Sequence, residues 1–95
     1  MDNGLLRQWA AKYIWWKTPE DALRAPDRII AQVMELGDYD DVLRLVDEAG
    51  EAVLSRVLQH ADAGQFSPKS WAYWHYRLGL AKPLQLPEMP RRKVA

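Results

Sequence analysis

The sequence predicts an all-α fold, with five to six short helices in a compact orthogonal bundle and a proline-rich C-terminal tail. Apolar residues recur at three- and four-residue intervals through most of the chain, which is typical of helices that bury one face. No segment alternates apolar and polar residues for long enough to indicate a strand. Prolines, glycines and capping residues interrupt the apolar stripes often, so we expect short helices with short connections.

A cap-and-proline signal separates the first two helices. The first is expected over about residues 4–14, where apolar side chains repeat at helical spacing. Thr18 and Pro19, followed by two acidic residues, are typical of a helix N-terminus, so the second helix begins there. That helix ends by Arg24, because the residue before Pro26 is pushed out of the helical region.

The third and fourth helices each lie between a start signal and a glycine. Pro26 opens the third helix, whose buried stripe runs to Leu36 before Gly37. Asp38 caps the fourth helix, which ends at Gly50. Glycine just after a helix is typical of the position where the backbone takes the left-handed conformation.

Two more helices complete a single helical domain over residues 1–82. The fifth helix follows an apolar stripe over residues 53–61 and fades at residues 63–64. Ser67 and Pro68 begin the last helix, which runs to about Leu78 before another glycine.

Residues 83–95 form the proline-rich basic tail, which ends in Arg91, Arg92, Lys93 and two further residues. A frayed terminus is one expectation for such a segment. The alternative is a strap that becomes ordered on a partner, in which case Arg91 and Arg92 assist binding.

The chain has no net charge, but its charges are unevenly distributed. Residues 35–62 contain two Lys/Arg and eight Asp/Glu, whereas residues 63–95 contain six Lys/Arg and one Asp/Glu. We expect the acidic middle and the basic end to pair within one chain or between chains. The alternative is a basic surface for an anionic partner.

The composition and hydropathy of the sequence indicate where the protein is located and which kinds of site it lacks. The sequence contains no cysteine, so neither a disulfide framework nor a thiolate metal site is expected. It shows no signal-peptide pattern and no apolar stretch that approaches a membrane span, so we expect a cytoplasmic protein that does not enter the membrane.

Residues typical of catalysis or metal binding are scarce. Asp38, Asp40 and Asp41 are interpreted as acids at a helix start, because the remaining ligands of a calcium loop are missing. The two histidines are far apart, and no serine lies in a nucleophile motif. We therefore expect a non-enzyme without a metal or cofactor. A small enzyme whose acidic middle binds a metal is the weaker alternative.

The last helix carries an unusual density of aromatic residues. Trp71, Trp74 and Leu78 share one stripe with His75, and this stripe is assigned to the core. The second stripe contains the residues assigned to a partner: Tyr73, Tyr76 and Arg77. Tyrosine and arginine are frequent anchors at interfaces. The alternative is that all four rings pack internally.

The adjacent Trp15 and Trp16 form a second candidate anchor, because neighbouring residues on a chain face different ways. We expect a protein–protein interaction module that uses one of these tryptophans together with Tyr73, Tyr76 and Arg77. A nucleic-acid-binding regulator that uses the basic segment 69–93 is the alternative function. A homodimer through the spare face of residues 68–79 is also consistent with the pattern.

The order of these features resembles a family of small, uncharacterised bacterial helical proteins. The resemblance covers about residues 13–80 and is carried by these segments: Tyr13-Ile14-Trp15-Trp16, Ile29-Ile30, Val33-Met34, Leu36-Gly37-Asp38, Val42-Leu43, Leu45-Val46 and Ser67-Pro68-Lys69-Ser70-Trp71-Ala72-Tyr73-Trp74. Members are often encoded beside nucleotidyltransferase-like proteins of the abortive-infection, toxin–antitoxin type. The resemblance implies a protein-binding role as an antitoxin or accessory subunit of such a toxin.

Overall fold

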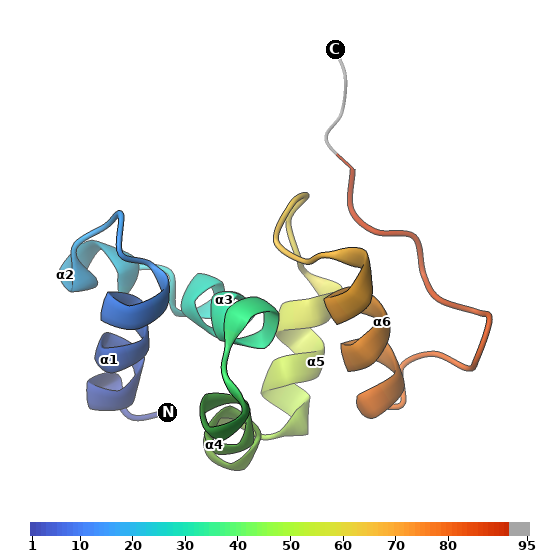
Figure 1. The fold of residues 1–95 in the computed structure, drawn as a ribbon, viewed down its shortest axis with the longest axis horizontal. Coiled ribbons are helices and arrows are strands. Elements are labelled where there is room, and N and C mark those ends of the chain that lie inside the picture. The colour runs from blue at the N-terminus through green and yellow to red at the C-terminus, as the bar shows by residue number, and fades with distance from the viewer. Residues whose placement is uncertain (92–95) are drawn as a thin grey trace.

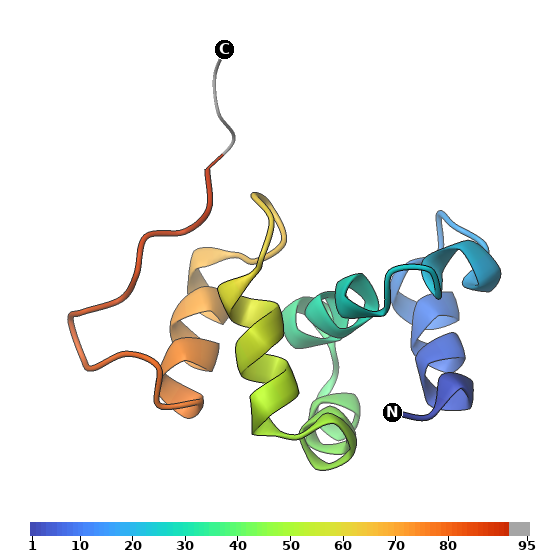
Figure 2. The same ribbon diagram turned by 180° about the vertical axis from the view of Figure 1, so that it is seen from behind.

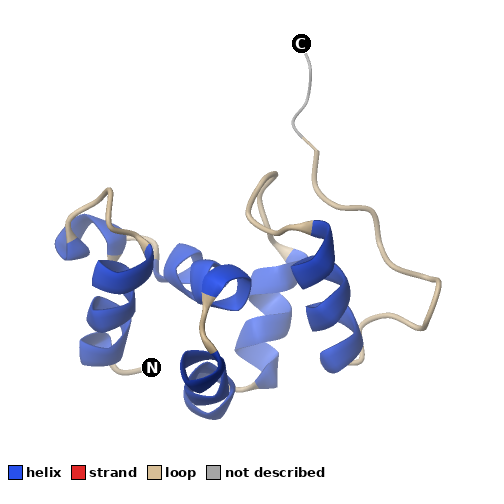
Figure 3. Cartoon of the chain, in the orientation of Figure 1, coloured by secondary structure: helices blue, strands red, loops and turns tan. Residues whose placement is uncertain are grey.

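A computed structural model describes residues 1–91, and this part of the chain forms helices joined by loops (Figure 3). The six helices are α1 (Asn3–Tyr13), α2 (Pro19–Ala22), α3 (Pro26–Leu36), α4 (Tyr39–Ala49), α5 (Glu51–Gln59) and α6 (Pro68–Arg77). No strand occurs within residues 1–91, so the predicted all-α class is confirmed.

Helix α3 is the centre of the fold. It packs against all five of the other helices, which surround it in Figure 1 and in the reverse view of Figure 2. Its buried face contains Ile29, Ile30, Ala31, Val33 and Met34. Leu36 was expected on the same stripe, but this last residue of the helix has an exposed side chain.

The predicted helix starts are confirmed by their capping hydrogen bonds. Each of the predicted caps accepts a hydrogen bond from the backbone N–H three residues later: Thr18 from Asp21 at 3.2 Å, Asp38 from Asp41 at 2.9 Å and Ser67 from Ser70 at 3.2 Å. Local sequence therefore fixes where α2, α4 and α6 begin.

The C-terminal ends of the helices differ from prediction more than their N-terminal ends do. Gly50 has a positive φ of 81°, which favours glycine, but its ψ of 161° is extended and not that of the expected left-handed cap, and Gly37 has φ of −58°. A Cβ atom at Gly37 would lie 2.4 Å from the carbonyl oxygen of Val33, so glycine is required here by close approach. Helix α5 ends at Gln59, earlier than predicted, and residues 60–65 form a loop.

Helix α6 is fixed to the end of α3 by two sets of hydrogen bonds. The indole Nε1 of Trp74 donates to the backbone oxygen of Met34 at 2.9 Å inside the core. The carboxylate of Glu35 accepts hydrogen bonds from Ser67 N at 2.7 Å, Ser67 Oγ at 2.8 Å and Ser70 Oγ at 2.7 Å. Glu35 thus orients α6, a role that the sequence pattern did not reveal.

Replacing Glu35 is expected to destabilise the fold. In Glu35→Ala, the hydroxyls and the N–H at the start of α6 lose their acceptor, which should lower the free energy of unfolding by about 1.5–3 kcal/mol. Urea unfolding monitored by tryptophan fluorescence measures this change. Glu48→Ala, which removes an exposed carboxylate from α4, is the matched control. Equal stability of the two variants would contradict the assigned role of Glu35.

Candidate protein-interaction surfaces

The aromatic helix α6 divides its rings between the core and solvent. Trp71 and Trp74 are buried in the core, where His75 is also buried. Tyr73 and Tyr76 are 47% and 43% exposed, and Arg77 is exposed beside them. The predicted exposure of these three residues is confirmed, and the alternative in which all four rings pack internally is wrong.

Contacts within the helix hold Arg77 over the exposed ring of Tyr73 and the buried ring of Trp74. Its Nη1 atom donates to the hydroxyl of Tyr73 at 2.5 Å. The guanidinium carbon lies 5.9 Å from the centre of the Tyr73 ring and 5.7 Å from that of Trp74. Such cation–π contacts restrict a long side chain that would otherwise be mobile, so the surface is partly preorganised for binding.

The two adjacent tryptophans lie in the connection between α1 and α2. Trp15 is 78% exposed and Trp16 is 56% exposed, so both rings, rather than one, reach solvent. Their ring centres are 5.7 Å apart and the rings are nearly perpendicular, which is a favourable edge-to-face arrangement. Exposed tryptophans in contact with each other form a concentrated apolar patch of the kind that interfaces use.

A cleft of about 450 Å³ lies beside Trp16. Its wall is formed by the α1–α2 connection, the start of α3 and the loop of residues 62–65. Lys17, Arg28 and Asp62 are among its charged residues, and Arg28 and Asp62 form an ion pair at 3.9 Å. The cleft therefore combines an aromatic edge with polar groups of both signs.

The two predicted anchor groups do not meet. The α1–α2 connection and α6 lie on different sides of α3 in both views of the molecule (Figures 1 and 2). Helix α6 packs against α3 and α5, and it makes no packing contact with α1 or α2. The structure therefore contains two separate surfaces, one around Trp15 and Trp16 and one around Tyr73, Tyr76 and Arg77.

The described part of the tail contacts the domain. The indole Nε1 of the buried Trp71 donates to the backbone oxygen of Pro87 at 2.8 Å, and Met89 packs against the core. Arg91 is exposed, whereas Arg92 lies outside the described residues. The tail is thus attached to its own domain at Pro87 and Met89, which neither expectation for the tail included.

The acidic middle and the basic end do not pair within residues 1–91. The ion pairs among residues 1–91 are Arg7–Glu20, Lys12–Asp38, Lys12–Asp41, Arg28–Asp62 and Arg56–Asp27, and none of them includes a cation from residues 63–91. Lys69, Arg77, Lys82 and Arg91 form no ion pair with a described residue. The expected complementarity within one chain is therefore wrong for this part of the molecule.

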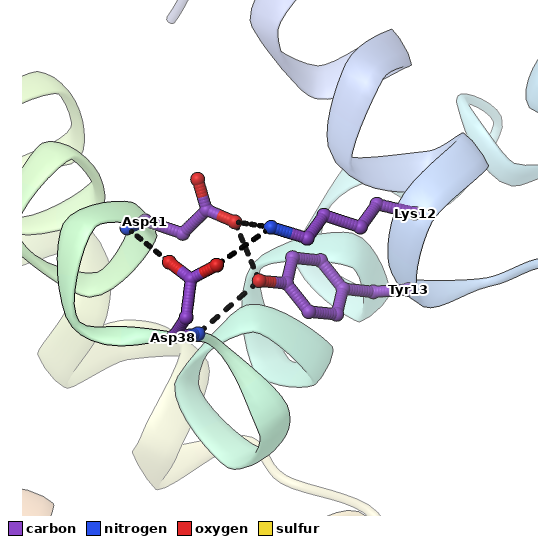
Figure 4. Close-up of polar contacts among 4 residues, drawn as sticks. All are labelled: Lys12, Tyr13, Asp38 and Asp41. Carbon is purple, nitrogen blue, oxygen red and sulfur yellow. Dashed lines mark hydrogen bonds and ion pairs between the residues drawn. The ribbon is translucent and has the colours of Figure 1, made fainter.

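A polar cluster joins the end of α1 to the start of α4 (Figure 4). Lys12 Nζ donates to Asp38 at 2.7 Å and to Asp41 at 2.8 Å. The hydroxyl of Tyr13 donates to the same Asp41 oxygen and accepts a hydrogen bond from the backbone N–H of Asp38 at 3.2 Å. Lys12 and Tyr13 thus occupy the oxygens of Asp38 and Asp41, and residues 1–91 contain no group of three or more side chains placed to hold a metal ion.

The cluster shifts the pKa of each member. Hydrogen bonds to Asp38 and then Asp41 raise the pKa of Lys12 above its usual value. Burial and the hydrogen bond to Asp41 raise the pKa of Tyr13. Lys12 and the N–H of Asp41 lower the pKa of Asp38. Burial opposes ionisation of Asp41, but hydrogen bonds from Lys12 and Tyr13 outweigh it and lower its pKa.

Sequence reasoning missed the exposed apolar residues on and before α4. Tyr39 is 77% exposed, and Leu36 and Leu43 are also exposed. Tyr39 and Leu43 are four residues apart and lie outside the stripe that contains the buried Leu45. This second stripe was the available signal, because a helix with apolar residues on two faces has one face left for a partner.

The cluster should make stability sensitive to acid. Asp38 and Asp41 have pKa values below their usual 3.8, so their stabilising contribution is complete well above that pH and is lost as the pH falls through the lowered values. Lys12→Gln removes a cause of both shifts. Its urea midpoint should therefore fall less than that of the unchanged protein between neutral pH and about pH 3. Equal losses in the two proteins would contradict this assignment.

Comparisons with known proteins found no relative of this chain. No family model, curated protein or solved structure matches the chain. Within residues 1–91, no helix is both long and apolar enough to span a membrane.

Proposed function

We propose that this chain is a non-catalytic protein–protein interaction module whose partner is anchored by Trp15 and Trp16. One observation carries the proposal: two tryptophans in mutual contact are exposed, and one of them, Trp16, lines a cleft of about 450 Å³. Tryptophan is among the residues that contribute most to binding energy, because covering its large ring removes much apolar surface from water.

The surroundings of the tryptophans favour a protein segment as the ligand. Interfaces combine an apolar centre with a polar rim that remains accessible to water. Here the rings supply the apolar centre, and Lys17, Arg28 and Asp62 supply hydrogen-bonding groups of both signs beside them. A partner loop that inserts an apolar side chain next to Trp16 and places backbone groups against these charges fits this arrangement.

The proposed partner is a nucleotidyltransferase-like toxin, as the family resemblance implies. In this proposal the chain is an antitoxin-like or accessory subunit in the cytoplasm, and it contributes binding and no catalytic group. The surface of Tyr73, Tyr76 and Arg77 is available for a second contact on the other side of α3.

A nucleic-acid-binding regulator is the second candidate. The observation in its favour is that the cations Lys69, Arg77, Lys82 and Arg91 form no ion pair within residues 1–91. Affinity for nucleic acid would then fall steeply with salt, with a log–log slope of about −0.7 to −0.9 for each phosphate neutralised. A flat salt dependence would exclude this candidate.

The tryptophan anchor is tested by capture of the partner from nuclease-treated lysate of the source cells. Trp15→Ala combined with Trp16→Ala should weaken binding to the captured protein by at least about 30-fold, because truncating a dominant interface residue costs about 2 kcal/mol or more. Titration calorimetry with the purified partner measures the loss.

Leu84→Ala is the matched control for this experiment. Leu84 is exposed like the tryptophans but lies in the tail, so its removal should leave binding unchanged. Both variants should retain the thermal unfolding of the original protein. Full affinity in the folded double tryptophan variant would contradict the proposed anchor. Loss of all capture after nuclease treatment would favour the nucleic-acid candidate instead.

A further inference from the structure

The tail of this chain is bound to its own domain as a separate segment. It leaves the C-terminal end of α6, swings out in a wide arc and returns toward the N-terminal end of the same helix (Figures 1 and 2). The indole Nε1 of Trp71 donates to the backbone oxygen of Pro87 at 2.8 Å, and Met89 packs against the core. With the tail in place, the Trp71 side chain is buried and its N–H has an acceptor.

The bound part of the tail has the pattern of an extended, proline-containing ligand. Leu86, Met89 and Pro90 are half-buried, whereas Pro87 and Glu88 are exposed. Leu86 and Met89 each precede a proline, which disfavours helical backbone and favours an extended conformation. A polyproline-type segment has three residues per turn, so Leu86 and Met89 lie on one face of it. The tail thus presents the pattern apolar-Pro-x-apolar-Pro to the domain.

Aromatic side chains form the domain's side of this contact. The ring centre of Trp71 lies 6.1 Å from that of Phe66 and 4.2 Å from that of His75, and these three residues are named the Trp71 site. Aromatic surfaces recognise proline-containing segments because such a segment is already extended before it binds and loses little conformational entropy. The indole N–H adds direction, since it is a donor only and has to meet a carbonyl oxygen. The contact of Trp71 with Pro87 has both features.

The tail is held weakly. Within the part of the chain that the structure describes, the bond to Trp71 is the only hydrogen bond that joins residues 83–91 to a helix. The tail begins in a turn closed by Gln85 N and Lys82 O at 3.0 Å, and this turn contains Leu84 with φ of 66°. A positive φ at this position favours glycine or asparagine, and the 99% exposed Leu84 side chain makes no contact that offsets the strain. Such a segment opens at a low cost in free energy.

We propose that the Trp71 site docks an extended apolar-Pro-x-apolar-Pro segment of a partner protein, and that the tail is its tethered and displaceable occupant. The tail itself defines the ligand, because it is the segment bound there. A partner segment with the same pattern makes the same contacts without the strained turn at Leu84. The proposal does not rest on the function proposed above, since Trp15 and Trp16 lie on the other side of α3.

Tethering determines which free segment displaces the tail. A segment joined to its site by a short linker meets that site at an effective concentration of about 1 mM. The tail of a second copy is an identical ligand at a far lower concentration, so it does not displace the tail already bound. A partner segment that binds more tightly does displace it. The occupant is therefore a different protein, and the tail limits binding to partners that exceed its own affinity.

Competition by a free copy of the tail tests the site. The probe is a fluorescent peptide with the sequence of residues 83–91, and fluorescence anisotropy follows its binding to the full chain. Met89→Asp places a charge in the apolar contact, so this variant releases its own tail and leaves the site open. It should bind the probe with a dissociation constant of about 0.1 mM or below, because a tail at about 1 mM effective concentration stays bound only with such an affinity. The unchanged chain should bind the probe at least about tenfold more weakly.

Two further variants and a second peptide provide the controls. Gln85→Asp places the same charge on an exposed residue of the tail, so it should bind the probe as weakly as the unchanged chain does. Leu84→Asn relieves the strained turn, because asparagine tolerates a positive φ. Solvent exchange of the Trp71 indole N–H, measured by NMR, should therefore slow by about threefold in this variant. A probe that itself carries Met89→Asp should bind none of the chains, and this result does not depend on the folding of a variant.

Three outcomes would overturn the proposal. The first is a folded Met89→Asp chain that binds no probe at about 1 mM, the effective concentration of the tethered tail. The second is equal binding of the original and the Asp-carrying probes, because the apolar pattern would then not be recognised. The third is an unchanged chain with twice the monomer mass of 11.0 kDa in sedimentation equilibrium that Met89→Asp reduces to the monomer, because a second copy would then be the occupant. Loss of partner capture in the tryptophan variant bears only on the proposed function.

Discussion

The attachment of α6 to the end of α3 is the constraint on which the exposed aromatic surface of α6 depends. Trp74 reaches the backbone of Met34 inside the core, and Glu35 receives the serine cap of α6. These contacts fix the rotation of α6 about its own axis. Once Trp71 and Trp74 face inward, the helical period leaves Tyr73, Tyr76 and Arg77 no other direction than outward. The tyrosines are thus exposed because the tryptophans on the opposite side of the helix are buried and hydrogen-bonded.

A comparable constraint acts at the start of α4. Asp38 closes the turn after α3, and Tyr13 and Lys12 bind Asp38 and Asp41 from the end of α1 (Figure 4). The buried Leu45 then sets the inward face of α4, which leaves Tyr39 outside although it is the first residue of the helix. The same cluster ends α1 near its last turn, directly before the two exposed tryptophans. Polar contacts at helix ends therefore determine where the apolar surfaces lie.

The sequence alone could predict the structural features that depend on residues close together in the chain. Helix starts at Thr18, Asp38 and Ser67 follow from side chains that bond the backbone three residues away, and the division of α6 into two stripes follows from its period. Glu35 could not be recognised, because its partners lie 32 and 35 residues along the chain. The separation of Trp15 and Trp16 from α6 was missed for the same reason: it depends on how α3 comes to lie between them. Leu36 was misplaced because a periodic pattern does not show where the neighbouring helices stop.

The two surfaces differ in the kind of partner that each favours. Around Trp15 and Trp16 the polar groups have both signs and lie beside a cleft, so recognition there depends on the shape of an inserted segment. On α6 the exposed rings of Tyr73 and Tyr76 lie beside Arg77, and Lys69 is exposed on the same helix, so recognition there depends on stacking against the rings and on positive charge.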